Sequence, residues 1–198
     1  MNKTIVFATS NENKVKEIKE MLISLDITLL TLKDLGLTIT AIETEDNFEG
    51  NALIKAKDIA SKCNYPVLAD DSGLSIRVLN GFPGVHSARF MEGMSYKDKC
   101  NALIGMMKND VDRRASYFDA LVYIDKKNNI EKTFLGRCDG DITLEYDEEA
   151  PYGFGYDPIF YSYDLKKTFG RSLPEEKDQI SHRGKALQML LDYLRTNR

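Results

Sequence analysis

The stretch "PVLADDSGLSI" carries two consecutive carboxylates, Asp70 and Asp71, at the end of a short apolar run. Asp, Ser and Gly are common turn residues, so a solvated acidic pair where a core strand ends is one interpretation. Successive side chains of an extended strand point to opposite faces, however, so both carboxylates cannot face solvent if the extension continues. One of them would then face inward and need a partner, such as a metal ion, a lysine or a cluster of backbone N–H groups.

A polar loop, "TSNENK", lies between an expected strand and the helix that follows it, and it ends at Lys14. Its small polar residues let backbone N–H groups point at an anion, and the helix N-terminus adds positive potential. The loop therefore predicts a phosphate cradle. The glycine-rich P-loop pattern is absent, and a plain helix N-cap formed by Ser10 or Asn11 accounts for this loop equally well.

The segment "NFEGNALIKAKDIA" places a lysine beside an apolar helix face. At about 100° per residue, Lys55 falls close to Phe48 and Ile59. It is either a lysine that extends along the edge of the core into water or a lysine aimed along a groove towards phosphate. Glu43 and Glu45 lie just upstream and are candidates for a second acidic arm, although loop glutamates are exposed by default.

An aromatic loop, "GFGYDPIF", places Phe154 and Tyr156 among glycines, followed by Asp157 before a proline. Glycines allow a close backbone approach, an aromatic ring offers a stacking surface for a base, and an Asp before Pro is biased to an extended conformation. A structural loop packed on the sheet would have a similar sequence.

The stretch "EEKDQISHRGKAL" carries Lys177, with His182 and Arg183 at the start of the last helix. These residues form either a solvated charged turn or a set of donors for phosphate or for the carbonyl oxygens of a base. Taken together, the five segments offer acids, cations, an aromatic platform and donors. That inventory suits a magnesium nucleoside polyphosphate.

Apolar residues recur along the chain with alternating strand and helix periods. The expected elements, in order, are a strand over residues 4–8, a helix with apolar positions from Val15 to Leu25, a helix over 48–63, strands over 66–69 and 74–79, a helix over 96–107, two β-rich runs in 115–142 that form a hairpin around 126–129, and a last helix containing Leu187, Leu190, Leu191 and Leu194. This order predicts an α/β fold with a mixed twisted sheet flanked by helices.

Composition limits the classes of function. The chain has 198 residues, of which 42% are hydrophobic, and this length predicts one domain over residues 1–198 with room for two lobes. The net charge of -4 argues against binding to a nucleic-acid polymer or a membrane. The three cysteines lack a Cys-x-x-Cys pair, so we expect neither a disulfide framework nor a zinc site. This use of cysteine predicts a cytoplasmic location. No apolar segment is long enough to predict a signal peptide or a membrane span.

Six ordered motifs, "FATSNENKVKEI", "NFEGNALIKA", "LADDSGL", "GFPGVHSARF", "GFGYDPIF" and "SHRGKAL", resemble those of the inosine triphosphate pyrophosphatases, also called XTP/dITP diphosphohydrolases. The resemblance covers nearly the whole chain. It implies two lobes with a central active-site cleft, Mg²⁺ as cofactor and a homodimer. It also implies hydrolysis of noncanonical purine nucleoside triphosphates (dITP, ITP and XTP) to the monophosphate and pyrophosphate, which cleanses the nucleotide pool.

The resemblance also implies residue roles. Asp71 would be the catalytic proton acceptor and a metal ligand, and Glu43 the other metal carboxylate. Ser10 and Glu45 stand where relatives usually or often have Gly, and the second departure leaves the choice between Glu43 and Glu45 open. The implied substrate-binding residues are Thr9, Ser10, Asn11, Glu12, Asn13, Lys14, Lys55, Ser72, Phe154, Gly155, Tyr156, Asp157, Lys177, His182 and Arg183.

Within that set, the lysines would bind phosphate, the aromatic loop would bind the base, and His182 with Arg183 would read it. Two other functions stay open from the sequence. One is a related house-cleaning pyrophosphatase for other altered nucleotides, and the other is a nucleotide-binding regulator without catalysis.

Overall fold

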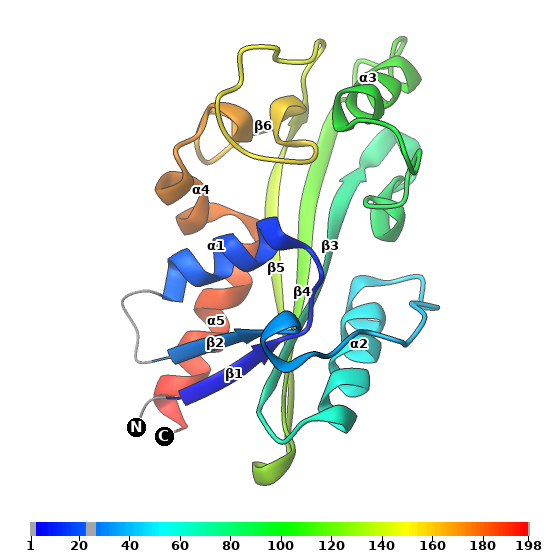
Figure 1. Ribbon diagram of the computed structural model, residues 1–198. Coiled ribbons are helices and arrows are strands. Elements are labelled where there is room, and N and C mark those ends of the chain that lie inside the picture. Colours follow the sequence, from blue (N-terminus) through cyan, green and yellow to red (C-terminus); the bar gives the residue numbers. More distant parts are fainter. Residues whose placement is uncertain (1–2, 23–26, 198) are drawn as a thin grey trace. The chain divides into compact units, whose positions relative to one another are not determined.

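The computed structural model describes residues 3–22 and 27–197 (Figure 1). Seven strands form one mixed sheet in the order β2-β1-β3-β4-β5-β6-β7. The chain divides into two compact units. Unit 1 comprises Met1–Asp71, Asp119–Gly136 and Ala186–Arg198, and unit 2 comprises Ser72–Phe118 and Arg137–Lys185. The predicted fold class, an α/β fold with a mixed sheet, is confirmed, whereas the single domain with a central cleft stays a prediction.

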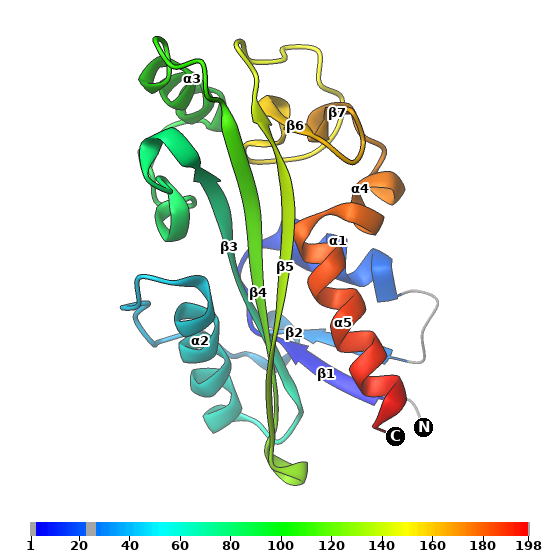
Figure 2. The same ribbon diagram turned by 180° about the vertical axis from the view of Figure 1, so that it is seen from behind.

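Unit 1 is a three-layer arrangement around parallel strands. Strands β1 (Lys3–Phe7) and β2 (Ile27–Thr31) pair in parallel, and β1 also pairs in parallel with β3 (Val67–Ile76). Helix α2 (Phe48–Lys62) covers one face of these strands, and α1 (Glu12–Leu22) and α5 (His182–Thr196) cover the other (Figure 2).

The alternation of side chains explains why unit 1 has two cores. Val67 and Ala69 of β3 pack with Ala56 of α2, whereas Leu68 packs with Ile18 of α1 and Leu187 of α5. Since every second residue of a strand points to the same face, an uninterrupted apolar strand can bury both faces beneath helices.

Unit 2 has one core under helix α3 (Tyr96–Met106). The inward residues of β4 (Arg114–Asp125) and β5 (Ile130–Ile142) meet α3 and the segment that contains β6 (Phe160–Ser162) and β7 (Lys167–Thr168). Strand β6 pairs antiparallel with both β5 and β7. Helix α4 (Pro174–Ile180) follows and leads into α5.

Several elements agree with the sequence prediction. The first strand, α1, α2, α3, the hairpin of β4 and β5, and α5 all occur within a few residues of their expected bounds. Strands β2, β6 and β7 and helix α4 were not predicted, and the expected apolar position Leu25 lies outside the described residues.

One prediction about local structure is wrong. The sequence predicted that one strand ends before Asp70 and that another begins at Leu74, but β3 runs without a break from Val67 to Ile76. In the sheet order β3 lies between β1 and β4, but its register with β1 covers Val67 and Leu68 and stops short of Asp70. The neighbour that supports the extended stretch of residues 70–73 is therefore β4, and this tertiary pairing outweighs the low strand propensity of Asp, Ser and Gly.

No helix among residues 3–22 and 27–197 combines the length and apolar character that a membrane crossing requires. Cys63, Cys100 and Cys138 are free thiols in the structure.

Candidate functional site

The tandem carboxylates of β3 point to opposite faces of the sheet, and each meets a different lysine. Asp70 is 1% exposed, and its Oδ2 lies 2.8 Å from the Nζ of Lys14, on α1. Asp71 is 7% exposed, and its Oδ1 lies 3.2 Å from the Nζ of Lys55, on α2. The uninterrupted strand therefore buries both carboxylates, because helices cover both faces of unit 1.

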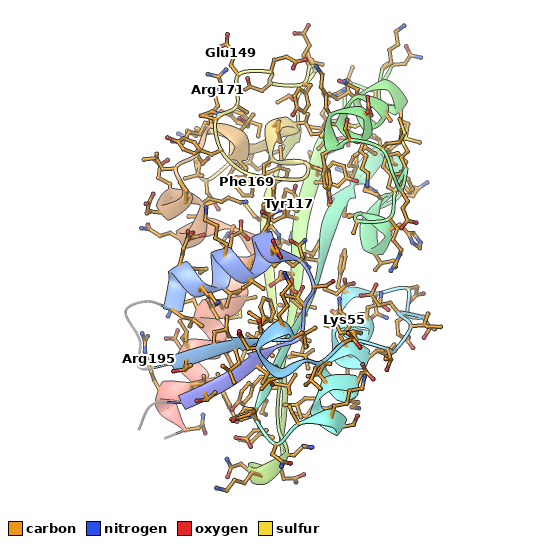
Figure 3. All side chains as sticks on the ribbon, in the orientation of Figure 1. Lys55, Tyr117, Glu149, Phe169, Arg171 and Arg195 are labelled. Atoms are coloured by element: carbon orange, nitrogen blue, oxygen red, sulfur yellow. The ribbon has the colours of Figure 1, made fainter. Side chains whose placement is uncertain are left out.

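Lys55, which is labelled in Figure 3, contacts two carboxylates. Its Nζ is 2.6 Å from Glu43 Oε1 and 3.2 Å from Asp71 Oδ1. All three side chains are mostly shielded from water. Unit 1 thus brings together Glu43, Lys55 and Asp71, which the sequence had placed in three separate segments.

This cluster has more negative than positive charge. Three carboxylates (Glu43, Asp70 and Asp71) face two lysines (Lys14 and Lys55). Burial raises the pKa of Asp71, and the negative charges of Glu43 and Asp70 add to this, outweighing the attraction of the lysines. Burial by itself would lower the pKa of Lys55, but Asp71, Asp70 and Glu43 raise it. Burial is thus the largest cause of the raised pKa of Asp71, whereas the raised pKa of Lys55 comes from its carboxylate neighbours.

The residues present fit a divalent metal ion. Asp71 Oδ2 is buried and receives no hydrogen bond from the described residues. The described part of the chain contains no group of three or more His, Cys, Asp or Glu side chains arranged around a common metal position. Mg²⁺ usually takes only one or two carboxylates and completes its shell with water and substrate phosphates, so Glu43 and Asp71 suffice.

The loop from Thr9 to Lys14 is ordered by its own side chains. The Asn11 Oδ1 accepts hydrogen bonds from the backbone N–H groups of Asn13 (3.0 Å) and Lys14 (3.4 Å), and the Asn11 N–H donates to Thr9 Oγ1. Asn11 therefore caps α1, which was one of the two interpretations of this loop. Ser10 is exposed, and the Glu12 carboxylate pairs with Lys33.

Asp157 organises the buried polar cluster of unit 2. It is 2% exposed, and its Oδ2 accepts hydrogen bonds from the Lys177 ammonium (2.8 Å) and the Phe154 N–H (2.8 Å). The Tyr117 hydroxyl makes a long contact of 3.5 Å with Asp157 Oδ1. The Lys177 ammonium also lies 4.9 Å from the centre of the Phe154 ring. Lys177, which we expected to bind phosphate, is therefore held by a carboxylate in this structure.

Two glycine-dependent contacts shape unit 2. Gly153 has φ +82°, and a Cβ there would lie 2.5 Å from Asp157 Oδ2, so only glycine lets the loop close over that carboxylate. A Cβ on Gly184 would lie 1.8 Å from the carbonyl oxygen of Asp178, so glycine also lets the first turn of α5 pack against α4. Ser181 caps α5 by accepting a hydrogen bond from the Gly184 N–H.

The predicted base-reading pair lies in this first turn of α5. The His182 ring stacks on the Tyr117 ring, with centroids 4.6 Å apart and planes within 6°. Arg183 is 3% exposed and donates from Nη2 to Ser72 Oγ at 3.1 Å. Unit 2 thus joins Arg183 to Ser72, two residues that the sequence named separately. In Figure 3, Tyr117 lies beside Phe169, and their rings stack at 5.9 Å.

Within the aromatic loop, Tyr156 and Gly155 make contacts inside unit 2. The Tyr156 hydroxyl donates to the Ser87 carbonyl oxygen at 2.7 Å, and the Gly155 carbonyl oxygen lies 3.7 Å from the Cys100 sulfur. Tyr156 is buried, so of the two aromatic rings named from the sequence only Phe154 is partly open to a ligand.

Sequence reasoning missed two residues of these clusters. Tyr117 follows from strand alternation, since it shares the inward face of β4 with Ala115. Asn51 is fully buried on α2 and binds the backbone of Glu45 at both its N–H and its carbonyl oxygen. The available signal was its place one helical turn before Lys55 on the same face.

Comparisons with known proteins identify the family. The Ham1 family matches residues 5–193. A dITP/XTP pyrophosphatase of Leptospira interrogans serovar copenhageni is 43% identical over 198 residues, which is 99% of each chain. The Staphylococcus aureus Ham1 protein superimposes with a TM-score of 0.87 at 35% identity, covering 99% of this chain and 100% of that one. A HAM1 protein from Coxiella burnetii gives a TM-score of 0.87 at 34% identity, covering 98% and 99%. The chain therefore belongs to the Ham1 family, and the family predicted from its motifs is confirmed.

Proposed function

We propose that this chain hydrolyses the noncanonical purine nucleoside triphosphates dITP, ITP and XTP to the monophosphate and pyrophosphate, with Mg²⁺ as cofactor. Membership of the Ham1 family and the name of the Leptospira relative, a dITP/XTP pyrophosphatase, support the reaction class. The observation that carries the proposal is the cluster of Glu43, Lys55 and Asp71, with a buried Asp71 oxygen that no described residue hydrogen-bonds.

The residues of unit 1 would bind the triphosphate. Glu43 and Asp71 would hold Mg²⁺, and the bound ion would neutralise phosphate charge while pyrophosphate leaves. Lys55 and Lys14 would exchange part of their contact with carboxylates for phosphate oxygens, because an ammonium has three donors and a phosphate oxygen carries negative charge. The N-terminus of α1 adds positive potential at the same loop, where the N–H groups of Asn13 and Lys14 donate to Asn11 Oδ1.

Asp71 would also act on the attacking water. A carboxylate oxygen with no hydrogen-bond donor of its own can accept one from water and so fix its direction of attack on the α-phosphorus. Burial raises the pKa of Asp71, which makes it a better proton acceptor than a solvated Asp, whereas a nearby metal ion lowers the pKa again. Orienting the water is therefore its main proposed contribution, and taking the proton is the second.

The residues of unit 2 would bind and read the base. Phe154 is partly exposed and would offer a ring face for stacking, and the Lys177 ammonium lies 4.9 Å from the centre of the same ring. His182 and Arg183 would donate to the 6-oxo group of hypoxanthine or xanthine. Adenine has an amino group at that position, so donors would face a donor, and the unpaired groups would disfavour it by about 1 to 3 kcal/mol each.

A panel of nucleoside triphosphates tests this proposal. With Mg²⁺ present, we expect ITP, dITP and XTP to release pyrophosphate with a far higher kcat/KM than ATP. Equal values for ITP and ATP would contradict the assignment of the base-reading residues. Release of inorganic phosphate in place of pyrophosphate would contradict attack at the α-phosphorus.

We also propose a homodimer that acts in the cytoplasm on free nucleotides. The dimer rests on the family resemblance, and the compartment is supported by the three free thiols. Sedimentation at working concentrations should give a species of twice the chain mass of 22.5 kDa, and a species of 22.5 kDa alone would contradict the dimer.

A further inference from the structure

The segment that precedes α2 is anchored to that helix by one buried amide. Asn51 is 0% exposed, its Oδ1 accepts a hydrogen bond from the Glu45 N–H at 3.0 Å, and its Nδ2 donates to the Glu45 carbonyl oxygen at 3.0 Å. One side chain therefore satisfies both backbone polar groups of a single loop residue. Because the donor and the acceptor can each be matched in only one way, the orientation of the amide is determined.

A glycine one residue earlier lets the same loop residue lie against the helix. A Cβ on Gly50 would lie 2.5 Å from Glu45 Cγ and 2.7 Å from Glu45 Cβ, so any larger residue would push the Glu45 side chain away. Asn47 works differently, since its side chain caps α2 by accepting a hydrogen bond from the Gly50 N–H at 2.8 Å. The contacts of Asn51 and Gly50 with Glu45, which we call the Glu45 clamp, are thus separate from the helix cap formed by Asn47 in the same turn.

The Glu45 clamp lies close in sequence to Glu43, the proposed metal-binding carboxylate. Glu43 stands two residues before Glu45, and its Oε1 lies 2.6 Å from the Nζ of Lys55. Asn51 and Lys55 are four residues apart in α2 and so lie on the same helix face. One face of α2 therefore holds the loop at Glu45 and receives the Glu43 side chain beside Asp71.

We propose that Asn51, together with the space left by Gly50, is a positioning residue that sets the Glu43 carboxylate beside Asp71 for a divalent cation. This inference rests on the proposed function, because it gives Glu43 and Asp71 to the metal ion. Groups that orient a metal ligand are worth about 10- to 100-fold in metal affinity or activity. Glu45 is itself exposed, so we expect the backbone groups that Asn51→Ala releases to turn to water and the fold to tolerate the change.

The first experiment compares Asn51→Ala with Asn47→Ala, a matched control in the same turn. Asn51→Ala should raise the Mg²⁺ concentration that gives half-maximal ITP hydrolysis by about 10- to 100-fold, with a smaller loss of kcat at saturating Mg²⁺. It should weaken Mn²⁺ binding without nucleotide, followed by electron paramagnetic resonance, by a similar factor. It should also speed hydrogen exchange at the Glu45 amide. Asn47→Ala should weaken the helix start and leave Mn²⁺ affinity unchanged.

The second experiment fills the space that Gly50 leaves for Glu45. Alanine is a better helix former than glycine, so a loss in Gly50→Ala would not come from helix propensity. We expect this variant to weaken Mn²⁺ binding, because its Cβ displaces Glu45. Adding Glu45→Gly, which removes the displaced atoms, should restore the affinity.

The outcomes separate this inference from the proposed function. A wild-type protein that releases no pyrophosphate from ITP contradicts the proposed function. An active wild type with unchanged Mn²⁺ affinity in both Asn51→Ala and Gly50→Ala contradicts the positioning inference alone. Equal losses of Mn²⁺ affinity in Asn51→Ala and Asn47→Ala also overturn it, because the effect then comes from the helix start.

Discussion

The substitution Asp71→Asn should abolish most activity without destabilising the protein. The Asp71 side chain is buried in a cluster with excess negative charge, and burial raises its pKa. A raised pKa means that the ionised carboxylate is disfavoured in the folded state, so at neutral pH this group costs stability relative to a neutral side chain of the same shape. Asparagine keeps the shape and removes the charge.

The size of the effect follows from the contacts. One Asp71 oxygen is buried without a hydrogen-bond partner among the described residues, and asparagine puts a neutral polar atom in the place of this charged group, which is less costly to bury. The substitution also weakens the 3.2 Å contact with Lys55, but Lys55 keeps Glu43 at 2.6 Å. The two changes oppose each other, so we expect a free energy of unfolding in metal-free buffer that is unchanged or raised by about 1 to 2 kcal/mol. Loss of the group that orients the water should lower kcat by about 10²- to 10⁴-fold.

Urea denaturation in the presence of a chelator measures the stability, and pyrophosphate release from ITP with Mg²⁺ measures the activity. The matched control is Asp70→Asn on the other face of β3, which removes the 2.8 Å contact with Lys14. That change should lower stability by about 1 to 3 kcal/mol, because it takes a counter-ion from a mostly buried ammonium. An Asp71→Asn variant that hydrolyses ITP at a near-normal rate, or that loses more stability than Asp70→Asn, would refute the reasoning.

Three further predictions follow from single contacts. Glu43→Gln should raise the Mg²⁺ concentration required for hydrolysis more than Glu45→Gln does, because Glu43 contacts Lys55 beside Asp71. If a Mg²⁺ titration gives the reverse order, the metal ligand is Glu45. Arg183→Ala should lower the ratio of kcat/KM for ITP to kcat/KM for ATP, whereas Phe154→Ala should weaken the binding of all purine nucleotides alike. A base-selective effect of Phe154→Ala would exclude simple stacking. Burial by itself would raise the pKa of Asp58, but its hydrogen bonds with Lys62 and Thr40 outweigh burial, and the net pKa is lowered. Asp58 therefore stabilises the fold above its unfolded pKa of 3.8, and this stabilisation is lost as the pH falls through the lowered folded pKa. Asp58→Asn should therefore cost about 1 kcal/mol at pH 7, at the low end because the pair lies near the surface, and a cost of the same size at pH 2 in urea denaturation would contradict this cause.

The choice between Glu43 and Glu45 illustrates a question that the sequence leaves open. Both residues stand in one short loop, and both are acidic. In the structure Asn51 holds the backbone of Glu45, so the Glu43 side chain is the one that meets Lys55. No local pattern contains this information, because it depends on how the loop is fastened to a helix.

Local periodicity was sufficient for most helices and for the long hairpin. Apolar residues that recur at helical spacing predicted α1, α2, α3 and α5, and the two β-rich runs around residues 126–129 predicted β4 and β5. These elements follow from the sequence because burial of one face requires a regular spacing of apolar side chains. The ordered motifs also identified the family, which the comparison with Ham1 confirmed.

The tertiary structure alone decided which charges meet. Asp70 and Asp71 read as a turn because Asp has a weak intrinsic preference for strands, yet β3 continues beyond its pairing with β1 as the neighbour of β4. Once the strand continues, its alternation sends the two carboxylates to opposite faces, where Lys14 of α1 and Lys55 of α2 lie 2.8 Å and 3.2 Å away. The sequence determined that acids and lysines are present in this region. The partner of each acid depends on strand pairing and on which helix covers which face, and these are set by contacts between residues far apart in the chain.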